Sequence, residues 1–229
     1  MDISSTPFET DGFGSFFVNV LCVLLMYGSA YLANTGAMLF GKWIPDKTGM
    51  PVLIIDGGKN YSDGHRILGD GKSWNGLIGG GIFSGILFII AHNLWNNNGT
   101  DAPFVDPLIY ANSSDWFWLF GGEMGSSFAA FTMGFILGFS CMIGDMCGSF
   151  VKRRRGLKRE GDESSEAPLL DTVPFAIAIF VTAFLLFDGQ IITHPNLVEE
   201  IVFLILITPV IHRSFNIIGY KFGLKEVPY

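Results

Sequence analysis

Residues 56–76, DGGKNYSDGHRILGDGKSWNG, combine a flexible backbone with both signs of charge: six glycines, three aspartates, two lysines and one arginine. Glycines let backbone N–H groups approach phosphate oxygens closely, and lysine and arginine side chains add fixed positive charge. Aspartates among such cations do not bind phosphate themselves, but they hold Mg²⁺ together with phosphate oxygens. The stretch therefore predicts a site for a large anionic ligand with Mg²⁺, whereas each Asp-Gly pair alone is equally typical of a turn.

The end of this stretch, RILGDGKS at 66–73, resembles the phosphate-binding loop of nucleotide-binding α/β proteins. The first glycine of that motif would fall on Arg66, and the β-strand that should precede the motif is missing from the pattern. These residues therefore indicate phosphate chemistry without that fold.

A second stretch, GDMCGSFVKRRRGLK from Gly144, places an acid directly before a basic cluster. Asp145 stands at the membrane edge of an apolar run, where an ionised side chain is costly and usually functional. A signal that merely ends a membrane span needs only the basic residues, so we expect Asp145 to act in the site. Asp171 in APLLDTVPF repeats the pattern, with a helix N-cap as the alternative role. Asn34 in YLANTGA is either a contact between helices or a ligand contact.

Hydrophobic runs dominate the rest of the chain. Of the 229 residues, 49% are hydrophobic and only 15% are charged, and the mean hydropathy is +0.42. A soluble domain carries more charge, and a bilayer-spanning helix needs about 20 predominantly apolar residues. We therefore expect an all-α integral membrane protein, one domain over residues 1–229, with cytoplasmic loops at about 43–75 and 145–171 forming the active site. The five runs predicted to span the membrane are 16–41, 77–95, 126–144, 172–187 and 197–219.

The basic residues predict how the chain lies in the membrane. If the five runs alternate across the bilayer, all 14 lysines and arginines fall on one side or at its edge, where Lys42 lies. The other side has ten acids and no lysine or arginine. Because cytoplasmic loops carry the excess of basic residues, we expect the N-terminus outside and the C-terminus in the cytoplasm.

Two classes of protein fit a membrane-embedded, cytoplasm-facing site for a polyphosphate with Mg²⁺. One is an enzyme that joins a nucleotide to a lipid phosphate, and the other is a transporter or channel for an anionic solute. A transporter would need polar or charged residues through the membrane and on both faces. The predicted spans are nearly free of charge and the outer face lacks lysine and arginine, which favours the enzyme. We expect membrane lipids around the protein and no nucleic acid partner.

The stretches IDGGKNYSDGHRILGDGKSWNGLIGG and GDMCGSFVKRRRGLKRE…APLLDTVPF, with ANTGA in the first span, closely resemble the CDP-archaeol synthase family. This is the archaeal CTP:2,3-di-O-geranylgeranylglycerol-1-phosphate cytidylyltransferase family, distantly related to bacterial CDP-diacylglycerol synthases. The resemblance implies a five-helix bundle in the cell membrane with CTP and an isoprenoid ether lipid phosphate as substrates. It implies Mg²⁺-dependent transfer of CMP to the lipid phosphate, giving CDP-archaeol and pyrophosphate. Because a phosphomonoester is already anionic near neutral pH, this reaction requires no general base.

The charge pattern and the resemblance together assign roles to individual residues. The predicted catalytic residues are Asp145, Asp70 and Lys72. The predicted Mg²⁺ ligands are Asp145, Asp70, Asp56, Asp63 and Asp171. The predicted substrate-binding residues are Asn34, Gly57, Gly58, Lys59, Arg66, Gly69, Gly71, Ser73, Trp74, Asn75, Ser149, Lys152 and Arg153.

The chain also departs from the family pattern. Ser73 stands where the family usually has threonine, and serine keeps the hydroxyl group. Residues 172–174 differ from the sequence that usually follows the aspartate at the position of Asp171. The outer loop 96–127 is long for the family. A phosphatidate cytidylyltransferase acting on ester lipids is the alternative enzyme, and a homodimer is a further expectation.

Overall fold

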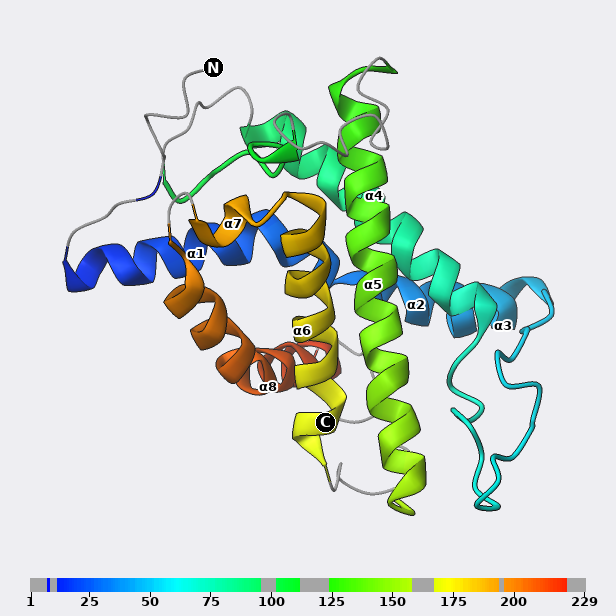
Figure 1. The fold of residues 1–229 in the computed structure, drawn as a ribbon. Helices are drawn as coiled ribbons and strands as arrows, with labels where there is room; N and C mark the ends of the chain where they lie inside the picture. The colour runs from blue at the N-terminus through cyan, green and yellow to red at the C-terminus, as the bar shows by residue number, and fades with distance from the viewer. Residues whose placement is uncertain are drawn as a thin grey trace.

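Helices make up most of the structure, a computed structural model that describes residues 8, 12–95, 102–111, 124–157, 167–193 and 196–221 (Figure 1). Strand-like pairing within these residues is limited to isolated bridges in the segment 49–73, so the all-α prediction is confirmed. The helices are α1 (Phe13–Tyr31), α2 (Ala33–Met38), η1 (Leu39–Trp43), α3 (Ile44–Thr48), α4 (Trp74–Trp95), α5 (Ser126–Arg154), α6 (Pro168–Leu186), α7 (Gln190–Thr193) and α8 (Val198–Lys221).

Four helical segments of the described chain are long and apolar enough to cross a membrane. They cover four of the five predicted runs, and the first of them joins α1, α2, η1 and α3 into one long helix. α8 covers the fifth predicted run but is not among the four, so the fifth span stays a prediction. The four segments are Gly14–Thr48, Trp74–Trp95, Ser126–Arg154 and Leu169–Leu186.

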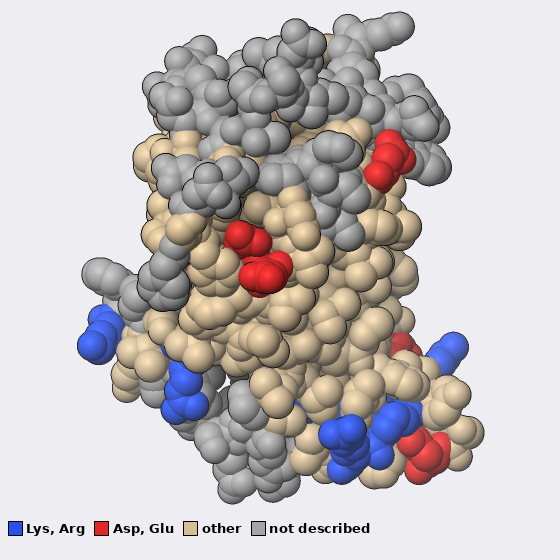
Figure 2. All heavy atoms as spheres, turned by 60° about the vertical axis from the view of Figure 1, so that its left-hand side comes forward, with Lys and Arg blue, Asp and Glu red and all other residues tan. Residues whose placement is uncertain are grey.

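Lysine and arginine side chains gather at one end of the molecule. In the space-filling view of the described residues, they lie only toward the lower end, whereas the charged side chains farther up are acidic (Figure 2). α5 ends and α6 begins toward that lower end, and the segment 49–73 lies beside the last turns of α5 (Figure 1). The two stretches with predicted chemistry therefore lie at the basic end of the bundle.

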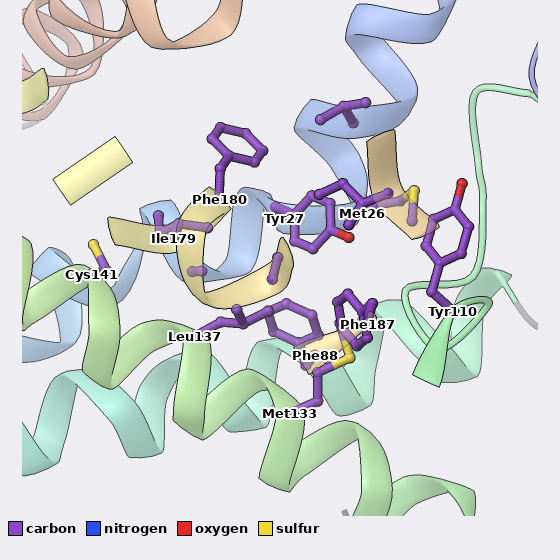
Figure 3. Close-up of a cluster of buried hydrophobic side chains, with 14 of the residues drawn as sticks. Met26, Tyr27, Phe88, Tyr110, Met133, Leu137, Cys141, Ile179, Phe180 and Phe187 are labelled. Carbon is purple, nitrogen blue, oxygen red and sulfur yellow. The ribbon is translucent and has the colours of Figure 1, made fainter. Parts of the chain in front are cut away.

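The buried core lies where α1, α4, α5 and α6 meet, as the close-up shows (Figure 3). Tyr27 of α1 packs edge-on against Phe180 of α6, with 5.8 Å between the ring centroids. Side chains from all four helices interdigitate here, which fixes α5 relative to its neighbours. Fully buried members of this core include Met26, Phe88, Met133, Leu137 and Ile179.

Glycines allow α5 to cross its neighbours at close range. A Cβ atom on Gly138 would overlap the side chain of Ser84 in α4, and one on Gly148 would overlap the carbonyl oxygen of Leu170 in α6. Small residues at such contacts let the backbones of membrane helices approach and pack closely. The last turns of α5, which carry Asp145 and the basic cluster, are thus held firmly against α6.

Candidate active site

The segment 49–73, called the glycine loop below, folds back on itself between α3 and α4. At its base, the N–H of Ile55 donates to the carbonyl oxygen of Lys72 at 2.9 Å. Farther out, the N–H of Ile67 donates to the carbonyl oxygen of Lys59 at 3.2 Å. These backbone hydrogen bonds give the loop a defined shape despite its glycine content.

Asp56 organises the glycine loop from its centre, with a side chain only 1% exposed. Its carboxylate accepts hydrogen bonds from the Arg66 guanidinium at 2.8 and 3.3 Å. It also accepts from the backbone N–H groups of Gly58, Leu68 and Gly69, at 3.1, 3.0 and 2.9 Å. Burial raises the pKa of this carboxyl, but the hydrogen bonds from Arg66 and the backbone outweigh it and hold the pKa well below its usual range. Both oxygens of Asp56 are therefore engaged within the loop.

Two of the predicted substrate-binding glycines shape the loop around this carboxylate. Gly58 and Gly69 adopt φ angles of +80° and +97°, a region that only glycine enters at little cost. Gly69 also lies against α5, because a Cβ atom there would stand 3.3 Å from the Arg153 guanidinium. Gly57, Gly58 and Gly71 are exposed on the loop surface. The N–H of Gly57 donates to the carbonyl oxygen of Ile54 at 3.2 Å.

Arg154, which carried no predicted role, fastens the glycine loop to the end of α5. Its guanidinium lies against the rings of Tyr61 and Phe150, 4.9 and 4.8 Å from their centroids, and the two rings pack edge-to-face with their centroids 5.7 Å apart. Its Nε lies 3.1 Å from Oδ2 of Asp63, and its Nη2 donates to the carbonyl oxygen of His65 at 3.2 Å. Arginine suits this position because its planar group contacts aromatic rings while its Nη2 donates to the carbonyl oxygens of His65 and Arg66. The signal in the sequence is Phe150 one helical turn before the arginine run.

Lys72 and Asp145 join the two predicted stretches directly. Their side chains form an ion pair between the glycine loop and α5, and are 21% and 17% exposed. Arg153 adds a weaker contact, since its Nε donates to the carbonyl oxygen of Leu68 at 3.5 Å. Two of the three predicted catalytic residues thus touch each other at the end of a membrane-spanning helix.

A second ion pair, between Lys152 and Asp171, is buried between α5 and α6. Asp145, Ser149 and Lys152 are spaced by four and three residues, so they lie on one face of α5. Ser149 is buried on this face. A row of polar side chains therefore leads from the glycine loop along α5 to the start of α6.

Every predicted Mg²⁺ ligand is paired with a basic side chain in this arrangement. Among the described residues, no group of three or more His, Cys, Asp or Glu side chains lies close enough to hold a metal by itself. Mg²⁺ does not need such a cage, because it binds through one or two carboxylates together with substrate phosphates and water. The ion pairs are Arg66 with Asp56 and Asp70, Arg154 with Asp63, Lys72 with Asp145, and Lys152 with Asp171.

Asp70 and Asp145 fit a Mg²⁺ site of this kind best. Asp70 is 66% exposed, and each of the two carboxylates has a single basic partner. A polyphosphate offers that partner the same ion pair that the aspartate provides. The site is therefore suited to take up a metal–polyphosphate complex by exchanging partners, without leaving a charge unpaired.

Ser73 and Asn75 attach the glycine loop to the start of α4. Oγ of Ser73 accepts from the N–H of Gly76 at 3.1 Å, the pattern of a helix N-cap. Oδ1 of Asn75 accepts from the N–H of Leu53 at 2.9 Å, and its Nδ2 donates to the carbonyl oxygen of Pro51 at 3.3 Å. The hydroxyl of Ser73 and the amide of Asn75 therefore connect the glycine loop to α4 in this structure.

The remaining predicted residues, Trp74, Lys59 and Asn34, lie around this centre. Trp74 is exposed on α4 directly after the glycine loop. Lys59 is exposed on the loop and forms no ion pair with any described residue, which leaves its charge available to an anion. Asn34 is half-buried in α2, next to Ala33, whose carbonyl oxygen faces Gly80 of α4.

The fold first defines the class of protein. A solved structure described as "Structural insight into an intramembrane enzyme for archaeal membrane lipids biosynthesis" matches with a TM-score of 0.55 and 22% sequence identity. The match covers 85% of this chain and 92% of that one. At this identity the likeness shows the fold, that of an intramembrane protein with several apolar helices.

Sequence comparison then identifies the family. A model of the CarS-like CDP-archaeol synthase family matches residues 16–229, and the chain belongs to this family. The CDP-archaeol synthase of Methanospirillum hungatei is 34% identical over 200 residues, which cover 87% of this chain and 98% of that relative. The CDP-archaeol synthase of Picrophilus torridus is 31% identical over 215 residues, covering 93% and 100%. The predicted family is confirmed: the chain is an enzyme of membrane lipid biosynthesis, a nucleotidyltransferase, and a multi-pass membrane protein.

Proposed function

We propose that this chain transfers CMP from CTP to the phosphate of 2,3-bis-O-geranylgeranylglycerol 1-phosphate, an unsaturated archaeal ether lipid, and releases pyrophosphate. Family membership supports the formation of CDP-archaeol. The observation that carries the proposal is the Lys72–Asp145 pair, which joins the polar loop to the end of a membrane-spanning helix. A nucleotide from water and a phosphate on a lipid meet at such a boundary.

The reaction is a displacement at phosphorus. A phosphate oxygen of the lipid attacks the α-phosphorus of CTP, a new P–O bond forms, and the bond to the pyrophosphate oxygen breaks. Since the lipid phosphate is already anionic near neutral pH, no side chain has to remove a proton. The main barrier is the repulsion between two polyanions. Preorganised cationic groups in a site of low dielectric constant offset this repulsion.

The paired side chains divide this work. Lys72 and the exposed Lys59 on the glycine loop, together with Lys152 and Arg153 at the end of α5, would hold the triphosphate of CTP and the phosphate of the lipid. Asp145 and Asp70 would hold Mg²⁺, which supplies positive charge to the phosphates and orients the two reactants. In this proposal Asp56, Asp63 and Asp171 hold the loop and α6 in place through their ion pairs. Gly71, exposed on the loop, offers its backbone N–H to phosphate oxygens.

The proposal includes the placement of the site in the cell membrane. α8 is the fifth span, residues 1–229 form one domain, and the glycine loop and the end of α5 lie on the cytoplasmic side. The concentration of lysine and arginine at that end of the molecule supports this orientation (Figure 2).

A transfer assay on protein purified in detergent tests the proposal. Labelled CTP and MgCl₂ are offered with either geranylgeranylglyceryl phosphate or phosphatidic acid, and label in the lipid extract is counted. We expect label in the lipid phase with the ether lipid only. Label with both lipids would extend the substrates to ester lipids. Protein that binds CTP but labels neither lipid would contradict the proposal and favour a transporter.

A further inference from the structure

Residues 102–111, called the strap below, lie at the end of α4 opposite the glycine loop (Figure 1). Connecting segments normally run over the surface of a protein. The strap instead packs into the bundle, because Val105 and Ala111 are 0% exposed and Leu108 is 2% exposed. It is also folded on itself, since the N–H of Ala111 donates to the carbonyl oxygen of Leu108 at 3.0 Å. The strap is therefore part of the buried core at this end of the molecule.

A hydrogen bond between side chains joins the strap to α4. His92 lies near the end of α4, about 27 Å along the helix from Trp74 at its start. Its Nδ1 lies 2.9 Å from Oδ1 of Asp106, and because a carboxylate oxygen accepts, the histidine is the donor. The same oxygen accepts from the N–H of Leu108 at 3.0 Å, which folds the strap around the carboxylate.

His92 depends on this contact with the strap. Its side chain is only 3% exposed. Its other ring nitrogen, Nε2, is buried and has no hydrogen-bond partner among the described residues. A buried polar group is costly unless it is hydrogen-bonded. Lifting the strap away would leave both ring nitrogens of His92 without a protein partner in the described part of the chain, so the hydrogen bond to Asp106 favours the closed strap.

The strap also contacts α1 and the end of α6. The ring of Tyr110 packs against that of Phe187, directly after α6, with 6.4 Å between the centroids (Figure 3). Burial raises the pKa of the Tyr110 hydroxyl, and the nearby thiol of Cys22 in α1 raises it further. Phe104 adds a contact with Trp95 of α4, with 6.3 Å between the ring centroids. One short segment thus bridges α1, α4 and α6.

The interior of the bundle holds polar groups that the strap separates from water. Ser84, in α4 between the strap end and the glycine-loop end, is 0% exposed, and Tyr27 of α1 is 1% exposed. Neither the Ser84 hydroxyl nor the Tyr27 hydroxyl has a hydrogen-bond partner among the described residues. Water that entered at an open end could hydrate these groups, and it would weaken the electrostatic interactions inside the bundle.

We propose that the strap closes the bundle at the end opposite the candidate active site, and that the His92–Asp106 hydrogen bond is its latch. The interior then opens to reactants only at the end where the glycine loop meets α5. A transporter, by contrast, opens its interior to each side of the membrane in turn. The inference concerns the far end of the molecule and does not depend on which lipid accepts the CMP group.

The native cysteines report whether the strap is closed. Cys22, beside Tyr110, is 0% exposed, Cys141 in the middle of α5 is 1% exposed, and Cys147 is exposed. Purified protein is treated with N-ethylmaleimide, and the labelling rate of each cysteine is measured by mass spectrometry of its peptide. In the wild-type protein, we expect Cys147 to be labelled quickly and the other two thiols to be protected.

Substitutions at the latch should expose Cys22 alone. Asp106→Ala removes the acceptor and should accelerate the labelling of Cys22 by about tenfold, since labelling follows the population of the open strap. His92→Ala should have the same effect from the α4 side, and Cys141 should stay protected in both variants. Asp106→Asn keeps an acceptor oxygen and should retain most of the protection. The control is Glu199→Ala, which removes an exposed acid from the first turn of α8 and should change none of the rates.

Four results would count against the strap or its latch. Continued protection of Cys22 in both alanine variants of the latch would overturn the inference. Equal acceleration at Cys22 and Cys141 would overturn it too, because the whole bundle would then be loosened. Rapid labelling of Cys22 in the wild-type protein would show that this end is open. An effect of Asp106→Asn as large as that of Asp106→Ala would reject the hydrogen bond as the latch.

Discussion

The aspartates of the site differ in how many hydrogen bonds and ion pairs their carboxylates form. Asp56 is buried and accepts hydrogen bonds from one arginine and three backbone N–H groups. Leaving a buried donor unpaired costs about 1–3 kcal/mol, so withdrawing Asp56 from its partners would disrupt the glycine loop. Asp70 and Asp145 each have one basic partner, so they can change partners at far lower cost. Because of this difference, we assign the metal to Asp70 and Asp145 and not to Asp56.

The depressed pKa of Asp56 predicts an acid-sensitive glycine loop. Because its folded pKa lies below the unfolded value near 3.9, Asp56 stabilises the loop fully above about pH 4, and the stabilisation is lost as pH falls toward the folded pKa. We expect pepsin to cleave the loop faster, relative to an unstructured reference peptide, as pH falls from about 5 to 2. Asp56→Asn should be cut rapidly throughout this range.

The exposed Asp70 supplies the control for this experiment. Asp70→Asn removes a carboxylate of the same loop that is 66% exposed, and it should keep the wild-type pH profile. A wild-type cleavage rate that does not change with pH would contradict the role given to Asp56.

Among the helices, α5 carries most of the site residues. Its length could be predicted from the sequence only in part, and its contacts with the glycine loop could not. Hydropathy places its apolar part at 126–144, but the helix continues to Arg154, because lysine and arginine are good helix formers after the apolar run has ended. The proximity of Lys72 and Asp145 was not readable from the pattern, since 73 residues separate them. Ser73 and Asn75 were predicted from their place in the loop, and their bonds to the start of α4 depend on a turn that no local pattern specifies.

The contact between the glycine loop and α5 should depend on Arg154 as an arginine. Arg154→Lys keeps the charge but loses the planar group that lies against the rings of Tyr61 and Phe150. We expect kcat to fall by roughly tenfold, about 1.4 kcal/mol, because Lys72 is then positioned less well, while KM for CTP changes little. Protease cleavage of the loop should accelerate in the same variant.

Arg155→Lys is the matched control, because Arg155 is the next residue and is exposed. It should leave both turnover and loop cleavage unchanged. Equal losses in the two variants would show that charge at the end of α5, and not the stacked arginine, is what matters.

For the whole molecule, hydropathy and charge predict more than local motifs do. Four of the five predicted runs are helices able to span a membrane, and the basic residues gather at one end as the loop assignment requires (Figure 2). The close crossing of α5 with α4 through Gly138 was not predicted, because the sequence does not indicate which helix packs against a given glycine. The outer loop 96–127 lies largely outside the described residues.

The five-span topology predicts opposite accessibilities for two engineered cysteines. In a variant without its native cysteines, Lys59→Cys marks the glycine loop and Met124→Cys, at a residue 70% exposed, marks the start of α5. An impermeant maleimide should label the first only in inside-out vesicles and the second only in right-side-out vesicles. Labelling of both from the same side would contradict the topology.

The turnover of Asp145→Asn tests the central claim most directly. The substitution keeps the size of the side chain but removes the charge that pairs with Lys72 and would hold Mg²⁺. In the transfer assay with CTP and geranylgeranylglyceryl phosphate, we expect a loss of at least about 100-fold, with unchanged gel-filtration and thermal-unfolding profiles in detergent. Asp46→Asn, an exposed carboxylate of α3, should retain full activity. Near-normal turnover by a folded Asp145→Asn protein would contradict the claim that CMP transfer takes place where the glycine loop meets α5.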